Sequence, residues 1–217
     1  MRKAICLSVL FIPVSLGTAS AHAQSRAYLG LGAGVSNGKF KTGDFSLGLP
    51  QVAESADQTS LGWKALTGFR FHEHFAAEVS YADLGKFKYN YSEAGATGAA
   101  RIDYRVSGFT VSGSAIWPLA NGCSLFAKAG AFRSAAKASL ASASGNLATV
   151  FASAGIAPGS SFTVNRTTLL YGVGAQYDSP HQVGVRLEYE NYGEVGDSDT
   201  SRRVTASLIS ASVLFRF

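Results

Sequence analysis

Apolar residues recur at every second position over eight stretches of the chain, each about ten residues long. In the stretch 183–190, two valines, a leucine and a tyrosine alternate with a glycine, an arginine and two glutamates. A period of two predicts β-strands, and about ten residues is the length that a tilted strand needs to cross a bilayer. The predicted strands are 27–35, 61–71, 75–82, 109–117, 125–132, 169–177, 183–190 and 209–217.

The composition of the two strand faces separates a membrane barrel from a soluble one. One face carries glycine, serine, alanine and isolated charges, a set that suits a narrow polar interior. The other is apolar, with rings near the strand ends, as in the aromatic girdles at the two bilayer interfaces. The sequence therefore predicts an all-β fold, an eight-stranded antiparallel up-and-down transmembrane β-barrel. The predicted girdle residues are Trp63, Phe71, Phe75, Trp117 and Tyr177.

The connections between these strands alternate in length. Those after the second, fourth and sixth strands are short, and the others, 36–60, 83–100, 133–166 and 191–202, are long. Short periplasmic turns and long outer loops are typical of outer-membrane barrels, and an even strand count places both termini in the periplasm. Tyr104 and Val106 alternate out of phase with Phe109, which predicts a bulge near Ser107 and Gly108.

The N-terminal segment has the features of a secretory signal peptide. A cationic start at Met1–Lys3 precedes an apolar run, which ends in small residues at Ala21–Ala23. We predict that residues 1–23 are the signal peptide and residues 24–217 a single barrel domain. Cleavage leaves Cys123 alone, so no internal disulfide is expected. It also lowers the formal charge from +5 to about +3, which does not indicate nucleic acid as a partner.

Several segments carry a resemblance to a known family. They are "YLGLGAGVS" (28–36), "AAEVSYADLGK" (76–86), "LFAKAGAF" (125–132), "YGVGAQY" (171–177), "VRLEYENYG" (185–193) and the terminal "VLFRF". Together they resemble the small outer-membrane β-barrel family of the OmpA transmembrane domain and the opacity-type surface proteins. The resemblance implies that the last strand, with Phe215 and Phe217, is a signal for the barrel-assembly machinery. Because nothing follows that strand, we expect no periplasmic peptidoglycan-binding domain and no cell-wall tether.

Charged residues fall on the predicted interior face. Unpaired charges in a narrow lumen would be costly, so we expect a paired and hydrated network. Glu78, Lys128 and Glu188 resemble the lumen ion pairs of the family. Two roles remain open, which are filling of the interior and a gate for ions. The predicted network is Lys64, Arg70, Glu78, Lys128, Arg186, Glu188, Glu190 and Arg216.

Catalytic, cofactor and metal sites are not predicted. Glycines 30, 32 and 34 follow plain strand alternation, with no helix after them to make a dinucleotide loop. Enzymes among these barrels, such as lipid A deacylases and acyl transferases, need a serine near a histidine at the outer rim. The mature histidines His72, His74 and His181 all fall in predicted periplasmic turns, where His72 and His74 are expected to be solvated rather than bound to metal.

The predicted outer loops are the remaining candidates for function. Residues 135–165 are rich in alanine, serine and glycine, which suggests a mobile loop that binds a partner or has none in particular. Loop 191–202 is acidic, whereas Lys39, Lys41, Lys86 and Lys88 would pair with lipopolysaccharide phosphates.

We therefore predict a non-enzymatic protein of a Gram-negative outer membrane, with a structural or interaction role in envelope integrity, adhesion or host contact. Its expected partners are outer-membrane lipid, lipopolysaccharide and a surface or host ligand. A narrow porin-like ion channel gated by lumen salt bridges is the alternative, and a lipid A-modifying enzyme is third.

Overall fold

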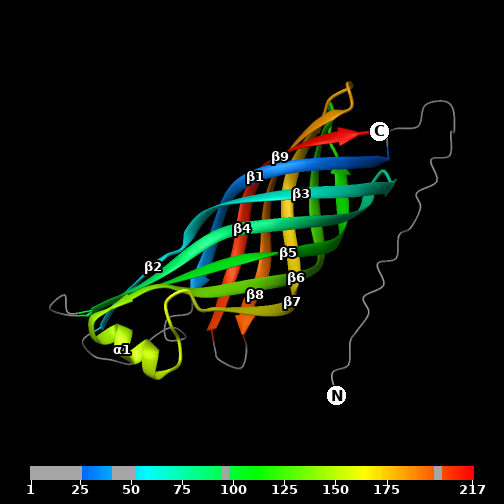
Figure 1. Cartoon of the computed structure of the whole chain (residues 1–217). Coiled ribbons are helices and arrows are strands. Elements are labelled where there is room, and N and C mark those ends of the chain that lie inside the picture. The colour runs from blue at the N-terminus through cyan, green and yellow to red at the C-terminus, as the bar shows by residue number, and fades with distance from the viewer. Residues whose placement is uncertain (1–25, 41–51, 94–97, 198–201) are drawn as a thin grey trace, which may run out of the picture.

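The computed structural model describes residues 26–40, 52–93, 98–197 and 202–217, and the predicted signal peptide and Lys41 lie outside these ranges. Nine strands form one sheet, and every neighbouring pair is antiparallel. Pairing of β4 with β5 closes the sheet into a ring of eight strands, which confirms the predicted barrel (Figure 1). The strands are β1 (Ala27–Phe40), β2 (Val52–Asp57), β3 (Thr59–His72), β4 (Phe75–Glu93), β5 (Gly98–Pro118), β6 (Cys123–Ser144), β7 (Ser161–Asp178), β8 (Val183–Asp197) and β9 (Arg202–Arg216).

The short strand β2 precedes β3, from which the single residue Gln58 separates it, and it pairs with β4 beyond the point where the pairing of β3 with β4 ends. It therefore lengthens the wall of the barrel without adding a strand to the ring. At the other end of the barrel lie the short connections β3–β4, β5–β6 and β7–β8 and the pairing of Tyr28 with Arg216. We call this the turn end.

At the end opposite the turn end, the strands are much longer than predicted. The predicted loops 83–100 and 133–166 are wrong, because β4, β5 and β6 run through most of them and β7 begins at Ser161. The segment predicted to be a mobile loop also contains helix α1 (Gly145–Ser153), which buries Leu147 and Phe151. No helix in the described ranges is long and apolar enough to cross a membrane.

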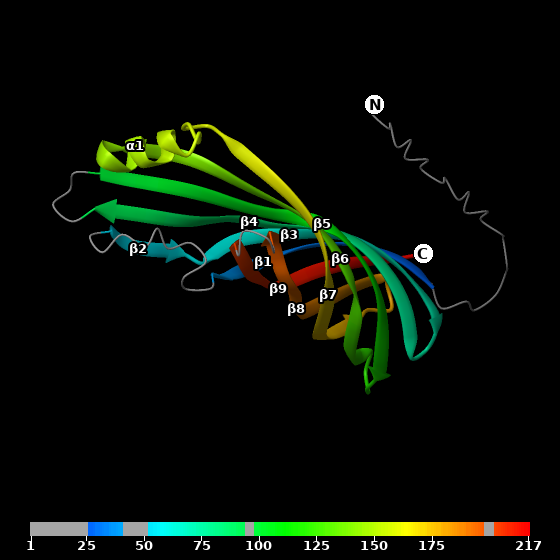
Figure 2. The same cartoon turned by 90° about the horizontal axis from the view of Figure 1, so that it is seen from below.

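We define the extension as β2 together with residues 86–93, 98–105 and 137–163. In Figure 2 it projects beyond the ring, with α1 lying over its far end. Partway along the barrel wall the two faces exchange polarity. Between the turn end and the extension, the side chains on the outer face of the wall are apolar, as at Leu31 and Val111. In the extension it is the buried side chains on the inner face that are apolar.

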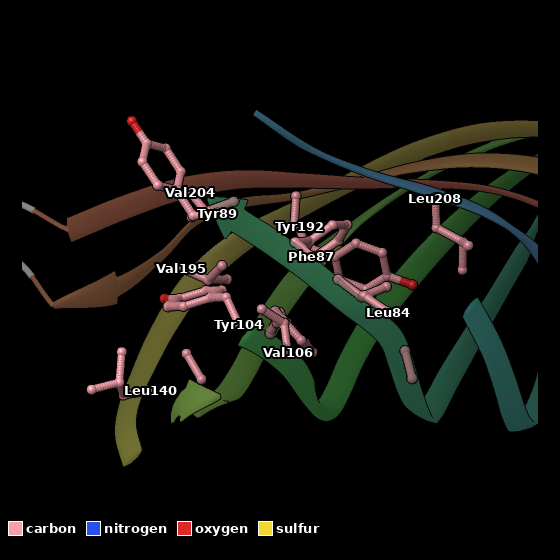
Figure 3. Packing of buried hydrophobic residues seen from close by; sticks show 14 of the residues in the cluster. Leu84, Phe87, Tyr89, Tyr104, Val106, Leu140, Tyr192, Val195, Val204 and Leu208 are labelled. Carbon is pink, nitrogen blue, oxygen red and sulfur yellow. The ribbon is translucent and has the colours of Figure 1, made fainter. Parts of the chain in front are cut away.

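An apolar cluster fills the interior from the base of the extension outward (Figure 3). Its buried members come from most strands and from α1, and Phe132 packs on Tyr192 with ring centroids 4.7 Å apart. They are Ala82, Leu84, Phe87, Tyr89, Tyr91, Ala100, Tyr104, Val106, Phe132, Ala136, Leu140, Leu147, Phe151, Leu170, Tyr192, Val195, Val204, Ala206 and Leu208.

This change of interior polarity explains a wrong prediction. Tyr104 and Val106 point inward in phase with Gly108, so the alternation along β5 is unbroken there. The register shift lies instead on the partner strand β4, between Asp83 and Lys86. Gly85 has φ +78° at this bulge, a backbone conformation that glycine adopts without strain.

Candidate functional site

Six charged side chains meet inside the barrel at the level where its outer surface is apolar. Three are cations, Lys64 on β3, Lys128 on β6 and Arg186 on β8; the other three are the carboxylates of Glu78 on β4 and of Glu188 and Glu190 on β8. All six residues are at most 5 % exposed. The strand alternation places each of them inward, and their formal charges cancel. We call these residues the lumen network.

The contacts within the lumen network are shared rather than pairwise. Lys64 contacts Glu188, and its Nζ lies 2.6 Å from Oε2 of Glu190. Lys128 also contacts Glu188, and its Nζ lies 2.7 Å from Glu190 Oε1 and 3.5 Å from Glu78 Oε2. Each lysine therefore bridges carboxylates, which offsets the cost of removing these charges from water.

Arg186 lies on the side of the lumen network nearer the turn end and contacts Glu78. Its Nη1 donates to Glu78 Oε1 at 2.7 Å, and its guanidinium carbon lies 4.6 Å from the ring centroid of Phe126. A cation over an aromatic face is an additional favourable contact in a desolvated site.

Two tyrosines complete the network, and sequence reasoning assigned no role to either. The Tyr28 hydroxyl donates to Glu78 Oε1 at 2.5 Å, and the Tyr192 hydroxyl donates to Glu190 Oε2 at 3.0 Å. Tyr192 is in phase with Glu188 and Glu190, so alternation along β8 could have identified it. Gly68 leaves room for Tyr28, since a Cβ there would lie 2.3 Å from the tyrosine Cζ.

Arg70 and Arg216, which were predicted in the same network, lie at the turn end instead. Arg216 Nη1 is 3.3 Å from Asp178 Oδ2, and Arg70 Nη2 is 3.8 Å from it. Gln176 links this group to the lumen network, because its Nε2 donates to Asp178 Oδ1 at 2.6 Å and its Oε1 accepts from Arg186 Nε at 3.0 Å. Sequence reasoning missed Asp178, which it assigned to a turn.

The two sides of the lumen network differ in access. On the turn-end side an open cavity of about 1010 Å³ is lined by Arg70, Ile116, Ser124, Asp178 and Arg216 among others. None of the six network residues lines that cavity. On the other side the apolar cluster begins directly at Tyr192.

The predicted girdle residues lie on the outer surface in two groups. Phe71, Phe75, Trp117 and Tyr177 are exposed near the turn end, as are the terminal Phe215 and Phe217. Trp63 is exposed near the extension, where its ring lies 5.6 Å from that of Tyr81.

Candidate groups for other chemistry lie at the turn end. His72 ends β3 and His74 lies in the first short turn, and Cys123 is exposed with a free thiol. Among the described residues, no group of three or more histidines, cysteines or carboxylates is arranged to hold a metal ion.

Comparison with known proteins places the chain among outer-membrane barrels. A family model described as the OmpA-like transmembrane domain matches residues 22–217. A search of curated protein sequences found no match.

Solved structures similar to the chain include Neisserial surface protein A, with a TM-score of 0.53 and 15 % identity over 88 % of this chain and 97 % of that one. The attachment invasion locus protein Ail of Yersinia pestis, in complex with the heparin analogue sucrose octasulfate, has a TM-score of 0.48 and 18 % identity over 88 % and 99 %. The outer-membrane protease OmpT of Escherichia coli has 0.45 and 7 % over 92 % and 99 %. At these identities the likeness concerns the fold alone.

Proposed function

The chain belongs to the OmpA-like transmembrane domain family, a family of outer-membrane barrels, and on this premise we propose that it acts through its extension at the cell surface and not by transport through its lumen. The turn end, where β1 begins and β9 ends, then faces the periplasm, and the extension faces outward. Envelope integrity, adhesion and host contact are roles of this kind, with lipopolysaccharide and a surface or host ligand as partners.

The observation that carries this proposal is that the lumen is closed at two successive levels. An ion would first have to separate the buried pairs of Lys64, Lys128 and Arg186 with their carboxylates. It would then have to pass the apolar cluster, where Phe132 lies directly on Tyr192. Eight strands enclose little space beyond their own side chains, so both barriers lie on any axial path.

The extension supports a role in contact with other molecules. Long strands and a helix held by their own apolar cluster form a rigid body outside the membrane. The exposed apolar side chains of Val150 and Phe162 lie on this body. A projection of this kind is suited to binding, because its chain is already ordered and the entropic cost of binding a partner is lower.

A non-enzymatic role is supported by the positions of the mature histidines. His72, His74 and His181 lie at or beside the turns of the turn end, whereas lipid A chemistry would need a base near the extension. Phe215 and Phe217 are assigned to recognition by the barrel-assembly machinery. Their side chains are exposed on the outward face, where a partner could read them during insertion.

Single-channel recording tests the proposal. The chain from residue 24 is refolded, inserted in a planar bilayer and compared with Glu78→Gln, while Glu73→Gln in an exposed turn serves as the matched control. We expect no discrete openings from any of the three, although the barrel is inserted by an independent measure such as protease protection. Discrete openings that change with Glu78→Gln and not with Glu73→Gln would overturn the closed-lumen proposal.

Those openings would favour the second candidate, a narrow channel gated by the lumen network. One observation favours it specifically. Lys128 contacts Glu78, Glu188 and Glu190 at the same time, so it could exchange partners without leaving a carboxylate unpaired.

A further inference from the structure

Three cations stand side by side on the outward face of the barrel wall, at the base of the extension. Lys86 on β4 is the register partner of Arg105 on β5, which is the register partner of Lys137 on β6. All three are exposed. Adjacent strands lie about 4.8 Å apart, so the three backbone positions fall within about 10 Å of one another. We call Lys86, Arg105 and Lys137 the cation row.

The cation row is not balanced by carboxylates within it. Arg105 pairs with Asp83, but the next position along the row, beyond Lys137, is Thr163. Like charges that face each other directly across strands destabilise a sheet. The row is therefore unfavourable in the isolated chain and would become favourable with an anion bound.

The row one step farther out has the opposite character. There Lys88 lies between Asp57 on β2 and Asp103 on β5, so a carboxylate stands on each side of it. Asp103 also pairs with Arg101, with 3.3 Å between Oδ1 and Nε. Lys88 is thus balanced by neighbouring carboxylates, whereas Lys86 and Lys137 have no carboxylate as a register partner.

Toward the membrane, the cation row is followed by an aromatic band. The rings of Trp63 and Tyr81 lie 5.6 Å apart, and those of Tyr81 and Phe109 5.1 Å apart. Arg133 is the register partner of Phe109 and adds a further cation at the level of the rings. From the membrane toward the extension, the outer face of the wall therefore carries apolar side chains, then the aromatic band, then the cation row.

We infer that the cation row binds the phosphates of a lipid A headgroup in the outer leaflet, with the aromatic band of Trp63, Tyr81 and Phe109 beside the base of its acyl chains. Lipid A carries phosphate groups at the two ends of a disaccharide, directly above its acyl chains. Lysine and arginine bind phosphate by charge-assisted hydrogen bonds, and rings prefer the interface below. The inference rests on the proposed orientation, with the extension outward.

The structure therefore divides the lysines that the sequence grouped together. Lys86 belongs to the cation row, whereas Lys88 is balanced by aspartates, and Lys39 pairs with Thr205 on β9. Arg105 and Lys137 were not among the predicted phosphate ligands, because their alignment with Lys86 depends on strand register.

The test is the binding of a fluorescent bisphosphorylated lipid A to the refolded chain in neutral detergent micelles, followed by anisotropy. Lys86→Gln with Lys137→Gln removes two cations of the row and leaves Arg105 to hold the buried Asp83. We expect this double variant to weaken binding by about 30-fold, since each charge near the surface contributes about fivefold. The matched control, Lys39→Gln with Lys88→Gln, makes the same change of charge outside the row and should bind within about twofold of the parent chain.

Competitors distinguish the possible sources of the phosphate. Unlabelled lipid A should displace the probe, and lipid A lacking one phosphate should do so less well. Equal displacement by phosphatidylglycerol or by millimolar inorganic phosphate would overturn the assignment to lipid A, as would equal binding by the two double variants. The proposed function fails separately, because ion conduction by the parent chain would leave these binding results unchanged.

Discussion

Charge balance in the lumen network makes a quantitative prediction for Glu78. Replacing Glu78 with glutamine keeps the size of the side chain but removes one of the three carboxylates, so three buried cations would face two anions. The loss affects Arg186 at 2.7 Å and Lys128 at 3.5 Å most directly. The two other carboxylates remain near Lys128, whereas Arg186 loses its carboxylate hydrogen-bond acceptor and keeps its hydrogen bond to the neutral Gln176.

The size of the effect follows from these distances. Two unit charges about 4 Å apart interact by about 4 kcal/mol at an effective dielectric constant of about 20, which suits partly hydrated protein interiors. Removing the charge of Glu78 also recovers the cost of burying it. Removal of one member of a buried pair has a net cost of about 3–5 kcal/mol, since the partner stays buried and charged. We therefore expect Glu78→Gln to lower the free energy of unfolding by about 3–5 kcal/mol.

The assay is reversible urea unfolding of the refolded chain in lipid vesicles, followed by tryptophan fluorescence. Arg186→Gln should destabilise the barrel by a similar amount, and Glu73→Gln, in an exposed turn, should have little effect. The double variant Glu78→Gln with Arg186→Gln restores neutrality, so its loss should be smaller than the sum of the single losses by at least about 1 kcal/mol. If the losses instead add within about 0.5 kcal/mol, the two residues do not act as a charge pair and the reasoning is refuted.

Two further predictions use the tyrosines at the ends of the lumen network. Gly68→Ala should lower the free energy of unfolding by about 1–3 kcal/mol, because the added Cβ displaces Tyr28. The control Gly113→Ala should leave it unchanged, because a Cβ there meets nothing within 4 Å. Equal stabilities of the two variants in the same urea assay would contradict this prediction. Tyr192→Phe removes the hydroxyl donor 3.0 Å from Glu190 and should cost about 1.5–3 kcal/mol, and a change below about 0.5 kcal/mol would show that this hydrogen bond does not stabilise the carboxylate.

Prediction from the sequence worked best where the information was local. The alternation of residues 183–190 is a property of one strand, and it was enough to place Arg186, Glu188 and Glu190 on one face. The same pattern predicted the antiparallel barrel, and the rings near the strand ends of the apolar face favoured a membrane barrel over a soluble one. It failed at 133–166, where polar and small residues continue as strand because the extension has its own apolar core.

Contacts between distant segments depended on the tertiary structure. Lys64 and Lys128 are far apart in the chain, and only closure of the ring brings both against Glu190. The sequence likewise put Arg70 and Arg216 in the same network, whereas their heights on the wall place them beside Asp178.

The sequence by itself determined the strands of the ring and the faces on which their side chains lie, because a period of two is set within each strand. Only the tertiary structure decided that Lys86, Arg105 and Lys137 form one row while Lys88 is balanced by aspartates. The bulge at Gly85 and the pairing of each strand with its neighbours set that alignment, and a shift of one residue would move every side chain to the other face. Register is a property of pairs of strands, and it decides which charges of this barrel meet.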